Sequence, residues 1–337
     1  MIQMMKRKLL KTLLIFSIAL MASVSHADAM PGDLNEDGVL SAADAACALR
    51  ESSMESGSEI LLKTAGLLDP ESSLPMGETP DIISPNHLYR FSYRDPVITD
   101  TQYTDSRISV TIEKKRFHKS QCYVADIYVR SLEYFRTAFS SGEYFGDRET
   151  VLDMAKNNGA VLAMSGDFYS MNARGAVIRN GELYRYKNRD TLSDSKDILV
   201  LYRDGSMQIY GPRKLKYEQI ASDPDIAQLW VFGPNLLSEY GSPKNTFHCA
   251  ESLLKRHPRG AIGYYEPGHY CFVIVDGRTD YSLGMTMDDL SDFMYSLGCT
   301  SAYNLDGGKT ACMVFMNEPV NRPAGGGRKC SDILLIG

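Results

Sequence analysis

The chain has 337 residues, of which 44% are hydrophobic and 23% are charged, and its net charge is −6. This length and composition are typical of a globular protein with one large domain, or with one domain and a small module. The acidic balance counts against a nucleic-acid partner and against binding to an anionic membrane surface by charge alone.

The first 27 residues have the pattern of a secretory signal. A basic segment, residues 6–11, precedes an apolar run over residues 13–24, and Ser25-His26-Ala27 is a cleavage site of the small-x-small type. The apolar run is too short to span a bilayer comfortably. We therefore expect cleavage after Ala27, a secreted protein, and no membrane association of the mature chain. An uncleaved anchor is the alternative.

Residues 28–69 contain a pattern typical of a calcium loop. In the stretch "GDLNEDGVLSAAD", oxygen-bearing residues alternate around a glycine, so that their side chains can converge on a hard cation. The expected Ca²⁺ ligands are Asp33, Asn35, Asp37, the backbone carbonyl of Val39, Ser41 and Asp44. The segment resembles one repeat of a dockerin, which implies calcium-dependent docking to a cohesin-like partner. A full dockerin has two such loops, however, and an acidic turn that binds nothing is the alternative.

The large domain is expected over residues 86–337, after a linker at residues 70–85 that is rich in Pro, Ser, Gly and Glu. We expect an α+β class with mixed sheets flanked by helices. Residues 108–117 alternate like a half-buried strand, and residues 122–131 form another. Apolar residues then recur at helical spacing over residues 148–159.

Short strands and turns fill the middle of this domain. A strand over residues 161–164 stops at the stretch "SGDFYS". Asn180-Gly181 and Asp204-Gly205 each join two short apolar runs, which is a strong signal for a β-hairpin.

The C-terminal third contains two apolar strands that each end in an acid, Asp276 and Asp306. A helix lies between them, capped by Thr286 with Asp289 three residues later. This strand–helix–strand unit has the size of a crossover connection. If the two strands are parallel neighbours, both carboxylates lie at the same edge of the sheet, where ligands of such sheets bind.

Several segments occur in the same order as in a known family and together cover residues 108–337. They are "AMSGDFYS", "GAVIRNGELY", "FGPNLL", "HPRGAIG", "VDGR" with "SLGMTMDDLSDFMYSLGCTSAYNLDGG", and "VNRP". The chain thereby resembles the phosphodiester glycosidases of the N-acetylglucosamine-1-phosphodiester α-N-acetylglucosaminidase type. The resemblance implies hydrolysis of the bond between a sugar anomeric carbon and a phosphodiester oxygen, in glycans or in cell-wall or capsular polymers. Two segments depart from the family pattern: Gly307-Gly308-Lys309-Thr310-Ala311 follows the acid, and Ser165-Gly166-Asp167 replaces Asn-Gly-Gly.

The leaving group of this reaction is a phosphate monoester, a stable anion, so a positive clamp matters more than protonation by a second carboxyl group. Arg259 is expected to bind the phosphate in bidentate fashion, and Lys309 to add a point charge. Asp306 is expected to act as the nucleophile or as the base that activates water, with Asp276 as the second candidate.

The remaining expected substrate contacts surround these groups. Asp167 would bind a sugar hydroxyl, and the backbone N–H groups of Gly307 and Gly308 would form an anion nest. The list is completed by Thr310, Glu266 and His269. An alternative stays open for the acids, because Asp-Gly is also a common turn pair in which the carboxylate caps its own backbone.

Other function classes are weighed against this one. The seven cysteines show no paired spacing, so a metal cluster is not expected, and neither a G-x-S-x-G elbow nor an H-E-x-x-H motif occurs. A non-catalytic glycan- or wall-binding protein on the same scaffold remains possible. A calcium-dependent docking protein is the second alternative.

Overall fold

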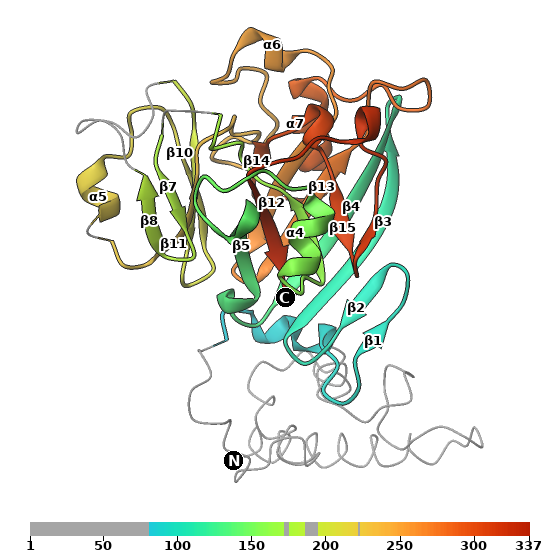
Figure 1. Cartoon of the computed structure of the whole chain (residues 1–337). Coiled ribbons are helices and arrows are strands. Elements are labelled where there is room, and N and C mark those ends of the chain that lie inside the picture. Colours follow the sequence, from blue (N-terminus) through green and yellow to red (C-terminus); the bar gives the residue numbers. More distant parts are fainter. Residues whose placement is uncertain (1–80, 172–174, 186–194, 222) are drawn as a thin grey trace, which may run out of the picture. The chain divides into compact units, whose positions relative to one another are not determined.

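The computed structural model describes residues 81–337 except 172–174, 186–194 and 222, and these residues fall into two units (Figure 1). One holds residues 85–95, with the 3-10 helix η1 (Pro85–Arg90). The other, the main unit, holds residues 81–84 and 96–337. The expected signal, the calcium loop with its Ca²⁺ ligands and most of the linker lie outside the described residues, so they stay predictions.

The main unit is built on a seven-stranded sheet in the order β1-β2-β3-β4-β13-β12-β14. Its strands are β1 (Val97–Ile98), β2 (Gln102–Thr104), β3 (Ile108–Phe117), β4 (Ser120–Val129), β13 (His269–Val275), β12 (Arg259–Glu266) and β14 (Ser301–Leu305). Successive residues of a strand face opposite sides, and both sides of β13 are covered. Phe272 and Ile274 enter one core cluster while Cys271 and Val273 enter another, which explains the near-continuous apolar run.

Two five-stranded sheets pack against the first of these clusters. One has the order β10-β9-β11-β7-β8, formed by β10 (Met207–Tyr210), β9 (Ile198–Tyr202), β11 (Ile226–Trp230), β7 (Val177–Arg179) and β8 (Glu182–Arg185). The other has the order β16-β15-β6-β17-β5, formed by β16 (Glu318–Pro319), β15 (Met313–Phe315), β6 (Leu162–Ser165), β17 (Asp332–Ile336) and β5 (Phe135–Phe139). Leu199 and Trp230 of the one, and Leu162 and Leu334 of the other, share a core with Phe272.

Helices cover the outer faces (Figure 1). Helix α7 (Met287–Ser296) packs Leu290 and Phe293 on the seven-stranded sheet, and α4 (Val151–Asn157) packs Met154 on the sheet that contains β6. The shorter helical elements are α5 (Tyr217–Ala221), α6 (Glu251–Leu254), η2 (Leu132–Tyr134), η3 (Ser140–Gly142), η4 (Gly308–Thr310) and η5 (Ala324–Gly326). Within the described residues, no helix has the length and apolarity needed to cross a membrane.

Most local expectations are confirmed. Thr286 and Asp289 form the expected capping box of α7. Asn180-Gly181 joins β7 to β8, with φ angles of 53° and 82° that suit a type I′ hairpin. The coarse class, α+β, agrees with the structure, in which sheets dominate.

The expectation of mixed sheets with two parallel neighbours is wrong. Every strand pairing among the described residues is antiparallel, and β12 lies between β13 and β14. Since β12 runs against both, β13 and β14 still point the same way. Asp276 and Asp306 therefore do follow strands that end at one edge of the sheet, where Arg259 begins β12 opposite Val275.

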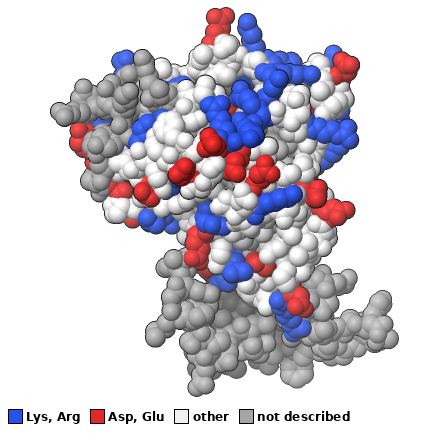
Figure 2. Space-filling model, viewed as in Figure 1, with Lys and Arg blue, Asp and Glu red and all other residues white. Residues whose placement is uncertain are grey.

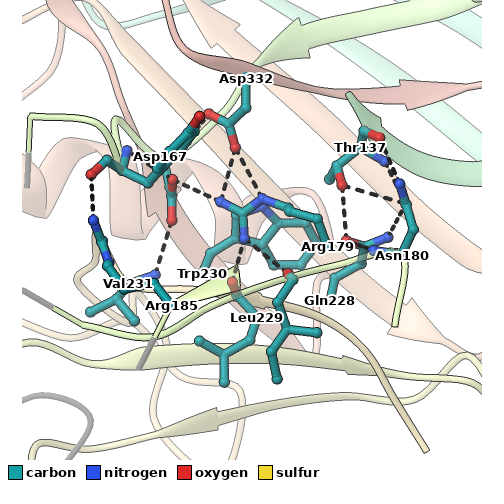
Figure 3. Close-up of polar contacts among 12 residues, drawn as sticks. Thr137, Asp167, Arg179, Asn180, Arg185, Gln228, Leu229, Trp230, Val231 and Asp332 are labelled. Carbon is teal, nitrogen blue, oxygen red and sulfur yellow. Dashed lines mark hydrogen bonds and ion pairs between the residues drawn. The ribbon is translucent and has the colours of Figure 1, made fainter. Parts of the chain in front are cut away.

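A buried arginine joins the two five-stranded sheets, as Figure 3 shows. Arg179 of β7 is only 2% exposed; its Nη2 donates to Asp167 Oδ1 and to Asp332 Oδ2 at 2.9 Å each. Asp332 begins β17, and Asp167 follows β6. Two carboxylates and one guanidinium leave a net negative charge in the core, and burial raises the pKa of Asp332 to about 7.

The raised pKa of Asp332 makes stability depend on pH in a defined direction. Below pH 3.8, the ordinary pKa, the Asp332 carboxyl group is neutral in both the folded and the unfolded protein. Between pH 3.8 and about 7 it ionises in the unfolded protein but stays protonated in the folded one, so its contribution to stability is lost as the pH rises. We expect the free energy of unfolding of the wild type, minus that of Asp332→Asn, to fall across this window by at most ~1.4 kcal/mol per pH unit. Urea unfolding at several pH values measures the difference. A constant or rising difference would contradict the assignment, and Asp280→Asn, at an exposed carboxylate, is the control.

Gly307 lies where the end of β14 meets the start of β12. A Cβ atom at Gly307 would lie 2.5 Å from the carbonyl oxygen of Pro258, and the Gly308 N–H group donates to that same oxygen at 2.9 Å. The two glycines thus allow the backbone to approach Pro258 closely.

We expect Gly307→Ala to destabilise the protein by about 1–3 kcal/mol, because the methyl group must displace the backbone. Gly211→Ala is a matched control, since its Cβ would meet Lys214 Cγ at an ordinary 3.7 Å. Thermal or urea unfolding compares the two. Equal midpoints for both variants would show that the Pro258 contact is not restrictive.

Candidate functional site

A cavity of about 490 Å³ lies at the edge of the seven-stranded sheet where β14 ends and β12 begins. Asp306 is the only carboxylate among the described residues that line it. The lining also holds four cations, Arg259, Arg278, Lys309 and Arg328. Figure 2 shows basic side chains gathered beside acidic ones in the upper part of the face in view.

Asp306 is fixed by three neighbours. Its Oδ1 accepts the Gly307 N–H group at 2.9 Å, and its Oδ2 accepts the Thr310 hydroxyl at 2.6 Å. Arg328 Nη2 is 3.6 Å from Oδ2. Burial raises the pKa of Asp306, while Thr310, Arg328 and Gly307 oppose that rise. The carboxylate is therefore oriented and partly shielded from water, as a nucleophile or general base requires.

Arg259 is buried, and most of its hydrogen-bonding capacity is used by the protein. Its Nε donates to the Met285 carbonyl, and its Nη2 donates to the carbonyls of Leu253 and Lys255. Burial lowers the pKa of Arg259 to about 10, so it stays charged at neutral pH. Within the described part of the chain Nη1 has no acceptor, so it is the nitrogen that Arg259 can offer to an anion in the cavity.

Two cations of the cavity are not found by sequence reasoning. Arg278 follows β13 and approaches His257 Nδ1 at 3.1 Å, and Arg328 lies 5.2 Å from the ring centre of Phe168. Arg278 lies in the "VDGR" segment of the family resemblance, which gave it no site role, and Arg328 comes from a loop without a recognisable motif. Arg278 and Phe168 have φ angles of 61° and 63°, and such strain at residues other than glycine concentrates at functional sites. For Arg328, the neighbouring glycines in "GGGR" are the signal that the sequence offers.

Asn304 adds an unsatisfied acceptor. Its Nδ2 donates to the Gly233 carbonyl at 2.7 Å, whereas its buried Oδ1 has no hydrogen-bond partner among the described residues. A buried polar atom without a partner costs roughly 1–3 kcal/mol. Since Asn304 lines the cavity, a hydroxyl group of a bound ligand would satisfy this oxygen. Its position inside an apolar strand gave no signal in the sequence.

Several expected contacts are already used inside the protein. The N–H groups of Gly307 and Gly308 donate to Asp306 and Pro258, so they do not form the expected anion nest. The Thr310 hydroxyl is buried and holds Asp306, so Thr310 positions the carboxylate instead of contacting substrate. Lys309 does line the cavity and is exposed.

Asp276 and Asp167 lie near this edge but not in the cavity lining. Asp276 is buried, and its carboxylate accepts from Asn321 Nδ2 at 2.9 Å and from the Tyr281 hydroxyl at 3.2 Å. The Asp167 carboxylate accepts from Arg179 and from two backbone N–H groups, those of Tyr169 and Val231. Both acids therefore hold loops in place, and the expected roles in catalysis and in hydroxyl binding have no geometric support.

Glu266 and His269 lie at the opposite end of the sheet. β12 runs from Arg259, at the cavity, to Glu266, and a strand of this length spans more than about 20 Å. His269 is stacked between the rings of Tyr128 and Tyr265, at 4.0 Å and 4.1 Å. These two residues do not reach the cavity, because the turn that carries them joins the far ends of β12 and β13.

Comparison with known proteins adds a curated relative. The chain is 30% identical over 191 residues to the SPbeta prophage-derived uncharacterized protein YomE of Bacillus subtilis (strain 168). The match covers 55% of this chain and 29% of that protein. The chain thus spans less than a third of the length of this relative.

Two solved structures resemble the fold. The zebrafish N-acetylglucosamine-1-phosphodiester alpha-N-acetylglucosaminidase catalytic domain, auto-inhibited by its pro-peptide, matches with a TM-score of 0.53 and 20% identity over 68% of this chain and 82% of that one. A hypothetical protein from Synechocystis matches with a TM-score of 0.52 and 12% identity over 68% of this chain and 62% of that one. At these identities the likeness shows the fold alone.

A family model supplies the assignment. Residues 158–337 match the model described as phosphodiester glycosidase. This range is more than half of the chain, and it contains every described residue that lines the cavity. The chain therefore belongs to the phosphodiester glycosidase family.

Proposed function

We propose that this protein is a hydrolase that cleaves the bond between the anomeric carbon of a sugar and the oxygen of a phosphodiester. The observation that supports this most is the charge pattern of the cavity, whose lining combines one oriented carboxylate with four cations. A phosphodiester brings an anion that the cations can neutralise, next to a carbon that the carboxylate can attack. Family membership supports the same class of reaction.

In this proposal Arg259 Nη1, Arg278, Lys309 and Arg328 bind the phosphate and stabilise the charge that it gains on leaving. Asp306 acts at the anomeric carbon, either as the nucleophile or as the base that activates water. Asn304 Oδ1 accepts a sugar hydroxyl. No second carboxyl group is required, because the phosphate leaves as a stable anion.

The remaining parts of the proposal rest on the sequence. We infer that the protein is secreted, that the sugar is N-acetylglucosamine, and that Asp33–Asp44 bind Ca²⁺ and dock a cohesin-like partner. Glycan phosphodiesters and the phosphodiester-linked polymers of cell walls and capsules have the chemistry that the cavity would accept.

The first test is free-sugar release from sugar-1-phosphodiesters, including UDP-N-acetylglucosamine, by the full chain. We expect Asp306→Asn to lower kcat by about 10²–10⁴-fold while substrate binding is retained, because the carboxylate acts in the chemical step. Asp280→Asn, at an exposed carboxylate, should match the wild type. If Asp306→Asn releases free sugar as fast as the wild type, the proposal is wrong. Binding by the wild type without any release would favour a glycan-binding protein.

A second prediction uses Thr310, whose hydroxyl holds down the pKa of Asp306. A carboxylate that acts in its ionised form loses activity as the pH falls through its pKa. We expect Thr310→Val to raise that pKa further and so to move the acid limb of kcat/KM to higher pH. Thr300→Val removes a hydroxyl that bonds the backbone at the far end of β12 and should leave the limb unchanged. An acid limb that stays put or moves to lower pH in Thr310→Val would exclude Asp306 as the titrating group.

A further inference from the structure

The loop between β5 and α4 exposes a bulky aromatic side chain from a strained backbone. Ser141 and Phe145 have φ angles of 55° and 64°, and Gly142 has 74°. Left-handed conformations at residues other than glycine cost roughly 1–3 kcal/mol each and persist only where the surroundings impose them. Phe145 is 56% exposed, so the strain is not offset by burying its ring.

The loop is held in this shape by several contacts. The Ser141 N–H group donates to the Glu149 carboxylate at 2.6 Å, and the Phe145 N–H group donates to the Tyr169 hydroxyl at 3.0 Å. A Cβ atom at Gly146 would lie 2.3 Å from the Ser140 carbonyl oxygen, so only glycine fits there. Phe145 is thus presented to solvent by a rigid element.

Phe145 belongs to an aromatic platform that consists of Tyr144, Phe145, Tyr169 and Tyr184. Tyr144 stacks on the buried Tyr169 with ring centres 5.3 Å apart, and meets Phe145 edge to face at 4.6 Å. Phe139 lies buried against Tyr144, Tyr169 and Tyr184. Polar groups accompany these rings: the Tyr184 hydroxyl donates to Glu182, and Arg185 donates to the Tyr169 carbonyl.

The platform is next to the cavity. Phe168 and Tyr169 are consecutive; the Phe168 ring lies under Arg328, which lines the cavity, whereas the Tyr169 ring lies in the platform. The left-handed φ of 63° at Phe168 is part of the turn that carries both rings. Two consecutive residues of one turn thus connect the cavity lining, through Arg328, to the platform.

We propose that the aromatic platform is a second sugar-binding subsite, which takes the neighbouring sugar unit of a phosphodiester-linked glycan chain. Aromatic faces and edges bind the apolar C–H face of a pyranose ring, while groups such as Glu182 and Arg185 suit its hydroxyls. The inference rests on the proposed function of the cavity and narrows its substrate class: a polymer engages both sites, and a sugar nucleotide engages only the cavity.

The test compares a polymer of N-acetylglucosamine 1-phosphate repeats with UDP-N-acetylglucosamine, using binding as the readout. We expect Phe145→Ala to weaken polymer binding about three- to tenfold in affinity electrophoresis and to leave the Kd for UDP-N-acetylglucosamine unchanged. Phe145→Tyr should retain polymer binding. Tyr240→Ala, at a side chain that is 92% exposed and outside the platform, is the matched control and should bind as the wild type does.

Three results would overturn the proposal: no polymer binding by the wild type, polymer binding unaffected by Phe145→Ala, or an equal loss for both ligands. A second copy of the chain on the platform would also overturn it. Such self-association would appear in light scattering as a molecular mass that increases with protein concentration. Phe145→Ala would abolish this increase and leave polymer binding unchanged. If polymer binding depends on Phe145 but no sugar is released, the subsite is supported and the hydrolase proposal fails. The failure of the subsite and the failure of the hydrolase proposal can therefore be distinguished.

Discussion

The site depends on a guanidinium group that two carboxylates share in the core. Arg179 comes from one five-stranded sheet and binds Asp167 and Asp332 of the other, so neither acid can move without leaving a buried charge unpaired. Gly166 is enclosed by this cluster, since a Cβ atom there would lie 2.3 Å from Asp332 Oδ1. Its carbonyl in turn accepts the Asp306 N–H group at 3.1 Å. The position of the proposed catalytic carboxylate is thus tied to an ion cluster that does not itself line the cavity.

The environment of Asp306 balances two opposed effects. Burial raises its pKa, and the Thr310 hydroxyl and the Arg328 guanidinium oppose the rise. A bound phosphate would neutralise part of the positive charge around the Asp306 carboxylate. The pKa of Asp306 would therefore change when substrate enters. Arg259 is the buried member of the cation set, whereas Arg278, Lys309 and Arg328 are exposed and interact with an anion under stronger screening by salt.

Local structure and several site residues, Asp306, Arg259 and Lys309 among them, could be predicted from the sequence, and the long-range arrangement could not. Alternation and capping identified β3, the hairpins and α7, because those signals lie within a few residues. Asp306 was found because it follows a strand and precedes two glycines. An apolar pattern identifies a strand but does not determine which strand pairs with it. The position of β12 between β13 and β14 was therefore not predicted. That pairing brings Arg278 and Asn304 together and carries Glu266 and His269 away, while Arg328 arrives from the loop before β17 of another sheet.

The antiparallel order of β13, β12 and β14 has an evolutionary consequence. Asp306 directly follows β14, a strand of the main sheet, whereas Arg278 and Arg328 come from loops that follow β13 and precede β17. Loops tolerate insertion and sequence drift far better than the strands they connect. Relatives with this fold can therefore lengthen or exchange those loops, and so recognise different phosphate-linked groups, without redesigning the part of the molecule that would perform the bond cleavage.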